Sequence, residues 1–162
     1  MAAGAALLGA LEEGSIASTI REAMWLYPLI EVVHIVGFSI LVGSVILFDL
    51  RVLGVSKRVP VRMLARHLLP WSVAALLLIV PAVVLLFATE ATTLIDNRAF
   101  VVKMILLTLA LTNAAAFHMG AFRGAEQWDQ GMSAPRAARL HALASIAIWI
   151  SIIACGRLIA YV

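Results

Sequence analysis

The four histidines of this chain are the side chains best suited to hold a metal ion or a haem. Each lies in or at the edge of a different apolar stretch, and they are His34, His67, His118 and His141. A neutral imidazole nitrogen is a common ligand of haem iron and of copper, and histidine is uncommon inside membrane-spanning segments. We therefore treat all four histidines as candidate cofactor-binding residues.

The positions of the histidines along the chain indicate which pairs would clamp a b-type haem. In an up-down bundle of four helices, the first and third helices are diagonal, and so are the second and fourth. His67 and His141 open the second and fourth apolar stretches at matched depth, which would hold a haem edge-on through the core. His34 and His118 are also diagonal, but their depths differ by about 10 Å or more at the rise of a helix.

Copper is the alternative to haem, because histidine, methionine and cysteine all bind it. His34 and His118 are the candidate metal ligands in this interpretation. Met104 and Met119 share the third apolar stretch with His118, and Cys155, the single cysteine, lies near the level of His34. No methionine or cysteine pair has helical spacing, so the sulfur signal for copper is weaker than the histidine signal for haem.

Two acidic residues share the first apolar stretch with His34. Glu31 and His34 are about 60° apart on a helix, and Asp49 returns to the angle of Glu31 after about five turns. The face that carries them should point into the bundle, since a charge that faces lipid costs several kcal/mol. We expect a structural ion pair between Glu31 and Arg157 of the fourth stretch, with Lys103 of the third as the rival partner.

The same residues also have a purely structural interpretation. A neutral His34 would be hydrogen-bonded to Asn113, Ser151 or Cys155 at its own depth. The other three histidines fall near a membrane interface, where histidine and arginine contact lipid headgroups. The residue types alone therefore leave cofactor binding and helix packing open.

The composition places these residues in a polytopic membrane protein. The chain has 162 residues, of which 64% are hydrophobic and 13% charged, and its mean hydropathy is +1.05. A membrane-spanning helix needs about 20 mostly apolar residues. Four stretches qualify, at about residues 25–50, 68–88, 100–122 and 140–160. We expect a single all-α domain over residues 1–162, an up-down bundle of four transmembrane helices.

The polar segments between these stretches are short. The segment before the first stretch mixes leucine and isoleucine with charged residues, which predicts one or two short amphipathic helices at the membrane interface. Pro135 is well placed to open the last helix. Small residues at helical spacing, such as Ser39 with Gly43, would permit close packing of the backbones.

The basic residues are distributed unevenly between these segments. Eight of the twelve lysines and arginines lie within residues 49–67 and 123–140. This asymmetry is the positive-inside signal. It predicts that loops 51–67 and 123–139 are cytoplasmic, and that both termini lie outside a bacterial cytoplasmic (inner) membrane. Anionic lipid at these loops explains the net charge of +3 without nucleic acid as a partner.

Several motifs of the chain resemble, nearly end to end, a bacterial family of small four-span membrane proteins of unknown function. They are E-x-x-H at Glu31 and His34, D-L-R at Asp49 and Arg51, N-x-x-x-x-H at Asn113 and His118, and G-R-x-x-A-Y at Arg157 and Tyr161. The chain is also loosely similar to the membrane domain of the CopD copper-resistance proteins. The family resemblance implies a four-helix fold and draws attention to His34 and His118 rather than to His67 and His141. It implies no activity.

Three functions follow from these observations. The first is a b-type haem protein that transfers electrons. The second is a protein that handles copper or another ion, in which Glu31, His34, Asp49 and His118 line a polar track. The third is a non-catalytic subunit or scaffold, as a homo-oligomer or within a larger membrane complex, whose buried charges set the register of the helices. Hydrolytic motifs, Gly-rich phosphate loops and zinc-protease signatures are absent from the sequence, which leaves open whether the protein is an enzyme.

Overall fold

A computed structural model describes residues 2–161, and within them every regular element is helical. The elements are α1 (Ala2–Glu12), α2 (Ser15–Glu22), α3 (Leu26–Leu53), α4 (Val61–Thr89), α5 (Ala91–Asp96), α6 (Arg98–Met119), the 3-10 helix η1 (Ala121–Trp128) and α7 (Arg136–Leu158). Four of them, α3, α4, α6 and α7, are long and apolar enough to cross a membrane. The expected all-α fold is confirmed, with two short helices before the first span.

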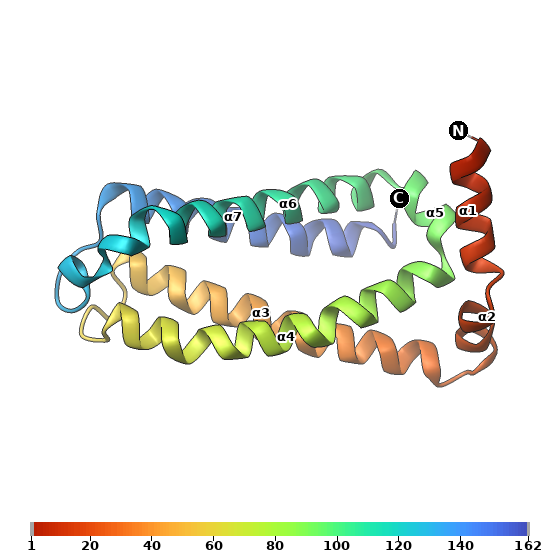
Figure 1. Cartoon of the computed structure of the whole chain (residues 1–162), viewed down its shortest axis with the longest axis horizontal. Helices are drawn as coiled ribbons and strands as arrows, with labels where there is room; N and C mark the ends of the chain where they lie inside the picture. The colour runs from red at the N-terminus through yellow and green to blue at the C-terminus, as the bar shows by residue number, and fades with distance from the viewer. Residues whose placement is uncertain (1, 162) are drawn as a thin grey trace.

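The four long helices form two antiparallel pairs. α3 packs along α4, α6 packs along α7, and α3 also packs against α7 to join the pairs. α3 and α4 cross each other, whereas α6 and α7 run side by side (Figure 1). Within the described residues, the backbone of α6 packs against neither α3 nor α4, and that of α4 does not pack against α7. The expected diagonal pairs are therefore present. α4 and α6 meet through side chains rather than through closely packed backbones, and the rings of Phe87 and Phe100 stack with their centroids 5.9 Å apart.

The two ends of the bundle are closed by different segments. At one end lie α1, α2 and α5, and α1 stands across the long helices (Figure 1). We call this the α1 end. At the other end, residues 54–60 connect α3 to α4, and residues 120–135, which include η1, connect α6 to α7. We call this the η1 end.

The helix boundaries differ from the expected ones where charged residues continue a helix. α4 begins at Val61, so residues 61–67, which were expected in a loop, form its first turns. α6 ends at Met119, and η1 replaces the expected last residues of that span. α7 begins directly after Pro135, as expected. Composition marks the apolar part of a span, whereas the helix itself extends into the polar boundary.

Local residues explain two of the helix ends. Gly54 ends α3 with a φ of 111°, a left-handed conformation that glycine adopts without a steric penalty. Its N–H donates to the carbonyl of Arg51 at 3.1 Å. Asn97 starts α6, because its Oδ1 accepts a hydrogen bond from the N–H of Phe100 at 3.1 Å.

An apolar cluster at the centre of the bundle draws on all four long helices. Among its members are Leu41 of α3, Ile79 of α4, Ala110 of α6 and Ile152 of α7. Many other apolar side chains face outward, and Leu77, for example, is 73% exposed. Lipid contact accounts for such a surface, because acyl chains are as apolar as leucine.

The close approach of α3 and α4 occurs at a glycine that sequence patterns did not single out. A Cβ on Gly37 would lie 2.9 Å from Cγ1 of Ile79 and 3.3 Å from the carbonyl oxygen of Ala75. Gly43 was expected to pack closely together with Ser39, but a Cβ there would meet nothing within 4 Å. The small residue that matters is therefore the one that faces α4.

The N-terminal helices are tied to the α1 end by side-chain contacts. Oε1 of Glu12 accepts hydrogen bonds from the N–H and the hydroxyl of Thr92 in α5, both at 2.8 Å. Nη1 of Arg21 donates to the carbonyl of Thr89 at the end of α4, at 3.2 Å. The N–H donated by Thr92, with its hydroxyl, holds the pKa of Glu12 below its usual value.

Candidate functional site

One pair of residues from the cofactor and motif candidates meets inside the bundle. Nδ2 of Asn113, in α6, donates to the backbone carbonyl of His141, in α7, at 3.1 Å. Oδ1 of Asn113 lies 2.8 Å from Nδ1 of His141. Because an amide oxygen only accepts, this contact places a proton on Nδ1 of His141. The double contact fixes the position of α6 along α7.

His118 lies near the η1 end of α6 beside two aromatic rings. Its ring centroid is 5.4 Å from that of Phe117 and 5.2 Å from that of Phe122. Phe117 also lies 6.2 Å from the ring of His141. Phe117 thus contacts both histidines, although His118 itself is exposed.

His67 has a different environment. It lies on α4 and is exposed, and no hydrogen bond, ion pair or ring contact involves it among the described residues. The backbones of α4 and α7 do not pack against each other there. The structure brings His141 together with Asn113 and Phe117 rather than with His67, and the haem pair of His67 and His141 stays a prediction.

His34 lies in the half of α3 nearer the α1 end, with its ring 6.1 Å from that of Phe38. Its Nδ1 atom is buried and has no hydrogen-bond partner within residues 2–161. Asn113 and Ser151 are used elsewhere: Asn113 bonds to α7, and the hydroxyl of Ser151 donates to the carbonyl of Ala147 at 2.8 Å. The expected hydrogen bonds from these two residues to His34 are wrong, because each finds a partner nearer to itself.

Lys103 of α6 is the basic residue that approaches His34. It interacts electrostatically with His34 of α3 and with Cys155 of α7. Its Nζ lies 3.6 Å from the point that a Cβ would occupy on Gly156. The lysine side chain therefore lies over a glycine of α7, where a Cβ would be in ordinary van der Waals contact with it.

The expected ion pair between Glu31 and Arg157 does not form. The ion pair found within residues 2–161 is that of Arg62 with Glu126, at 2.7 Å. Arg157 instead donates a hydrogen bond to the phenol oxygen of Tyr161, and its Cζ lies 4.8 Å from the centre of that ring. Residues four apart on neighbouring turns meet without help from tertiary structure. Glu31 is exposed, so the prediction that it points into the bundle is also wrong.

Asp49 does point into the bundle, as expected, and only 7% of it is exposed. The side chain of Ser145, on α7, interacts with its carboxyl group. Its Oδ2 atom has no hydrogen-bond partner among the described residues. Asp49 thus contributes to the contact between α3 and α7.

Arg51, the last residue of the D-L-R motif, connects the two loops at the η1 end. It is 2% exposed. Its guanidinium group donates to the backbone carbonyls of Val59, Lys57 and Asp129, at 2.5, 3.1 and 2.9 Å. The arginine therefore holds the α3–α4 loop against the segment that follows η1.

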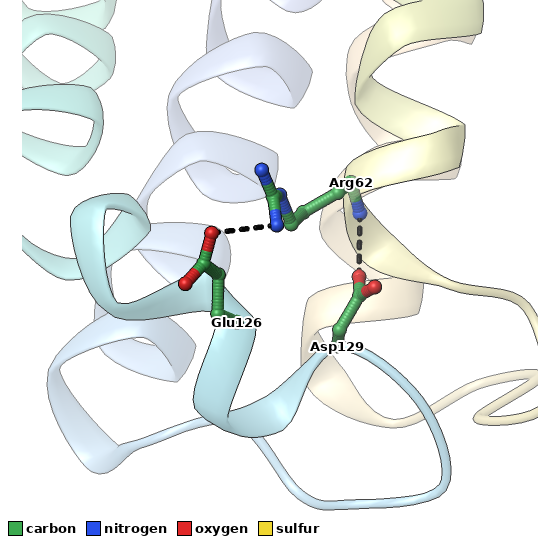
Figure 2. Close-up of polar contacts among 3 residues, drawn as sticks. All are labelled: Arg62, Glu126 and Asp129. Atoms are coloured by element: carbon green, nitrogen blue, oxygen red, sulfur yellow. Dashed lines mark hydrogen bonds and ion pairs between the residues drawn. The ribbon is translucent and has the colours of Figure 1, made fainter.

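Asp129 is the residue of this region that sequence reasoning missed. Its backbone carbonyl accepts from Arg51 and from the N–H of Val61, the latter at 2.9 Å. Its Oδ1 accepts from the N–H of Arg62 at 2.8 Å, while Nη1 of Arg62 bonds to Glu126 at 2.7 Å (Figure 2). Asp129 caps the start of α4 from across the fold, so no local sequence signal could have revealed it.

The polar residues of the interior form two separate groups. His34 and Lys103 lie toward the α1 end, and Asp49 lies toward the η1 end. Between these levels lies the central apolar cluster, which includes Leu41 and Ile152. The structure therefore contains an apolar layer across the polar track that was expected along α3.

A protein-bound metal ion needs several side-chain ligands that converge on one point. Within residues 2–161, no group of three or more histidine, cysteine, aspartate or glutamate side chains is placed to hold a metal ion. One hollow of about 340 Å³ lies between α2, α3 and α4, and a second of about 300 Å³ lies at the start of α4. None of the four histidines lines either hollow.

Similarity to other proteins assigns the chain to a family and adds no activity. Residues 17–162 match the model of a family of unknown function, DUF6644. Because the match covers most of the chain, the protein belongs to this family. No curated protein and no solved structure is similar enough to the chain to count as a match.

Proposed function

We propose that this DUF6644 protein is a non-catalytic membrane subunit or scaffold, in which the polar residues of the interior set the register of the helices. The double contact between Asn113 and His141 carries the proposal. Asn113 belongs to one of the motifs, and both of its side-chain polar atoms are bonded to the neighbouring helix. A residue in this state specifies how two helices pack and is not available to a substrate.

Other motif residues support the same interpretation. Arg51 bonds to three carbonyls of two loops, Asp49 interacts with Ser145, and Arg157 contacts Tyr161. Each of these contacts lies within the chain. Polar side chains that pair inside a membrane protein act as a specific attachment between helices, since hydrocarbon offers them no other partner.

A scaffold also needs a surface for a neighbour, and the exposed apolar faces of α4 and α6 suit that role. The backbones of these two helices do not pack closely, and their apolar residues include Leu77 and Leu111, which are 73% and 68% exposed. We place the η1 end, with its excess of lysine and arginine, on the cytoplasmic side of a bacterial inner membrane. In that orientation, α1 and α2 lie on the outer surface.

A b-type haem protein that transfers electrons is the second candidate, and one observation favours it. The proton on Nδ1 of His141 is held by Asn113, which is the arrangement that orients a histidine whose Nε2 binds a metal. His118 lies on the adjacent helix and shares Phe117 with His141. A haem here would use His141 with His118 or His67. Copper bound by His34 and His118 has less support, because the backbones of α3 and α6 do not pack together.

The test is an absorption spectrum, a metal analysis and a native mass measurement on protein extracted gently from its own membrane. The proposal expects no Soret band, no stoichiometric iron or copper, and a native mass above that of one 17.4 kDa chain. A Soret band that His141→Ala abolishes in a folded protein would replace the scaffold with the haem candidate. A metal-free protein that is strictly monomeric would refute both.

A double-mutant cycle tests the register-setting role of the pair. Asn113→Leu, His141→Leu and the double variant are unfolded in mixed micelles, and the coupling free energy is calculated from the four stabilities. We expect about 0.6–1.7 kcal/mol, the range found for hydrogen bonds between transmembrane helices. His67→Leu is the matched control, since His67 is exposed and should leave the stability unchanged. A coupling energy of zero would remove the observation on which the proposal rests.

A further inference from the structure

The hollow at the start of α4 has a composition that sets it apart from the rest of the η1 end. Its volume is about 300 Å³, and it is lined by Pro60, Arg62, Met63, Arg66 and Asp129. Two arginines one helical turn apart therefore face a single concave site. The remaining basic residues of this end, such as Arg136 and Arg139, do not line it.

The charges inside the hollow leave arginine donors free. Oδ1 of Asp129 accepts from the backbone N–H of Arg62 at 2.8 Å, so this carboxylate is already bonded to the start of α4 (Figure 2). Nη1 of Arg62 bonds to Glu126 at 2.7 Å, which occupies one of the five N–H donors of that guanidinium group. Arg66 is exposed and has no hydrogen bond or ion pair among the described residues. The hollow thus presents one free guanidinium group and part of a second.

The position of the hollow matches that of lipid headgroups. The apolar part of α4 begins at Leu68, two residues beyond Arg66, and Met63, in the wall of the hollow, is 68% exposed. A ligand in this place would meet arginine at one end and apolar surface at the other. The η1 end also has an overall positive charge, with eight basic residues (Arg51, Lys57, Arg58, Arg62, Arg66, Arg123, Arg136 and Arg139) against three acidic ones (Asp49, Glu126 and Asp129).

We propose that this hollow binds the phosphate group of an anionic phospholipid, with Arg62 and Arg66 as the phosphate ligands. A guanidinium group offers paired N–H donors that match the geometry of phosphate oxygens. Met63 and the first apolar turns of α4 contact the upper acyl chains. The site is independent of the proposed scaffold function, because it involves neither Asn113 nor His141.

The experiment measures lipid binding to the full chain in detergent by native mass spectrometry and by thermal unfolding. The probes are phosphatidylglycerol, phosphatidylcholine and inorganic phosphate. We expect phosphatidylglycerol to bind with defined stoichiometry and to raise the unfolding temperature, and the other two probes to do neither. Inorganic phosphate that acts as strongly as phosphatidylglycerol would overturn the assignment to a lipid.

Matched variants locate the binding. Arg62→Gln/Arg66→Gln should weaken phosphatidylglycerol binding by about fivefold per arginine. Arg136→Gln/Arg139→Gln removes the same charge from the first turns of α7, outside the hollow, and should keep the wild-type affinity. Equal losses in the two variants would show that the attraction is diffuse and would refute the site. Arg66 makes no hydrogen bond or ion pair with the described residues, so Arg66→Gln should fold like the wild type. This single variant repeats the test if the double variant fails to fold.

Discussion

The crossing of α3 and α4 depends on the absence of a side chain at Gly37. A Cβ at this position would lie 2.9 Å from Cγ1 of Ile79 and 3.3 Å from the backbone oxygen of Ala75. The first contact is shorter than real Cβ contacts, and the second involves backbone that cannot rotate away. Gly37→Ala should therefore push α4 away from α3 along part of their shared length.

The size of the effect follows from two opposing terms. Overpacking a close contact typically costs about 1–3 kcal/mol. Replacing glycine by alanine within a helix contributes up to about 1 kcal/mol in the opposite direction. Gly43→Ala on the same helix is the control, because its Cβ would meet nothing within 4 Å. The gain in helix propensity is the same in both variants and cancels when they are compared. The unfolding free energy of Gly37→Ala should therefore be about 1–3 kcal/mol lower than that of Gly43→Ala.

The assay is reversible unfolding of both variants in mixed micelles, followed by the circular dichroism signal of the helices. The stability difference between Gly37→Ala and Gly43→Ala is the quantity of interest, since both add one methyl group to α3. Equal stabilities would mean that the two helices do not meet at Gly37. A less stable Gly43→Ala would place the contact on the face of α3 that carries Gly43 and would refute the packing described above.

Two further predictions concern the ends of the bundle. Arg51→Met removes the donors to three backbone carbonyls at the η1 end, so it should lower the unfolding free energy by about 3 kcal/mol. The backbone amides of residues 54–60 should then exchange hydrogen faster. Unchanged exchange at these residues would contradict the bridging role of Arg51. Glu12 has a lowered pKa in the folded state, so its contact with Thr92 stabilises α1 above the unfolded-state pKa and is lost as the pH falls through the folded-state pKa. In the wild type, limited proteolysis before α2 should become faster as the pH falls through the folded-state pKa of Glu12. In Glu12→Gln, the same cleavage should be fast at every pH in that range.

The distribution of apolar residues was sufficient to predict the fold class and the existence of four spanning helices. Each span needs about 20 apolar residues, and that requirement can be read without knowledge of tertiary contacts. Pro135 was likewise a local signal, and α7 begins at the next residue. The start of α4 at Val61 was missed, because its cap is supplied by Asp129 from a distant segment.

At the candidate site, the sequence indicated which residues would matter but not which residues they would contact. The motifs pointed to Asn113, Arg51 and Asp49, and all three are bonded or buried in the interior. Their partners were not predictable. Asn113 was assigned to His34 because the two lie at similar depth, but depth gives no information about which way a helix is rotated.

The sequence by itself determined which helices are apolar enough to span a membrane and which polar residues they carry. Hydrophobicity and helix length are local properties of the chain, so they can be read without tertiary contacts. Tertiary structure alone decided that α3 packs against both α4 and α7, that Gly37 rather than Gly43 is the contact point, and that Asn113 pairs with His141 instead of His34. These outcomes depend on the rotation of each helix about its axis. That rotation is set by packing between residues far apart in the sequence, and no periodicity within one helix encodes it.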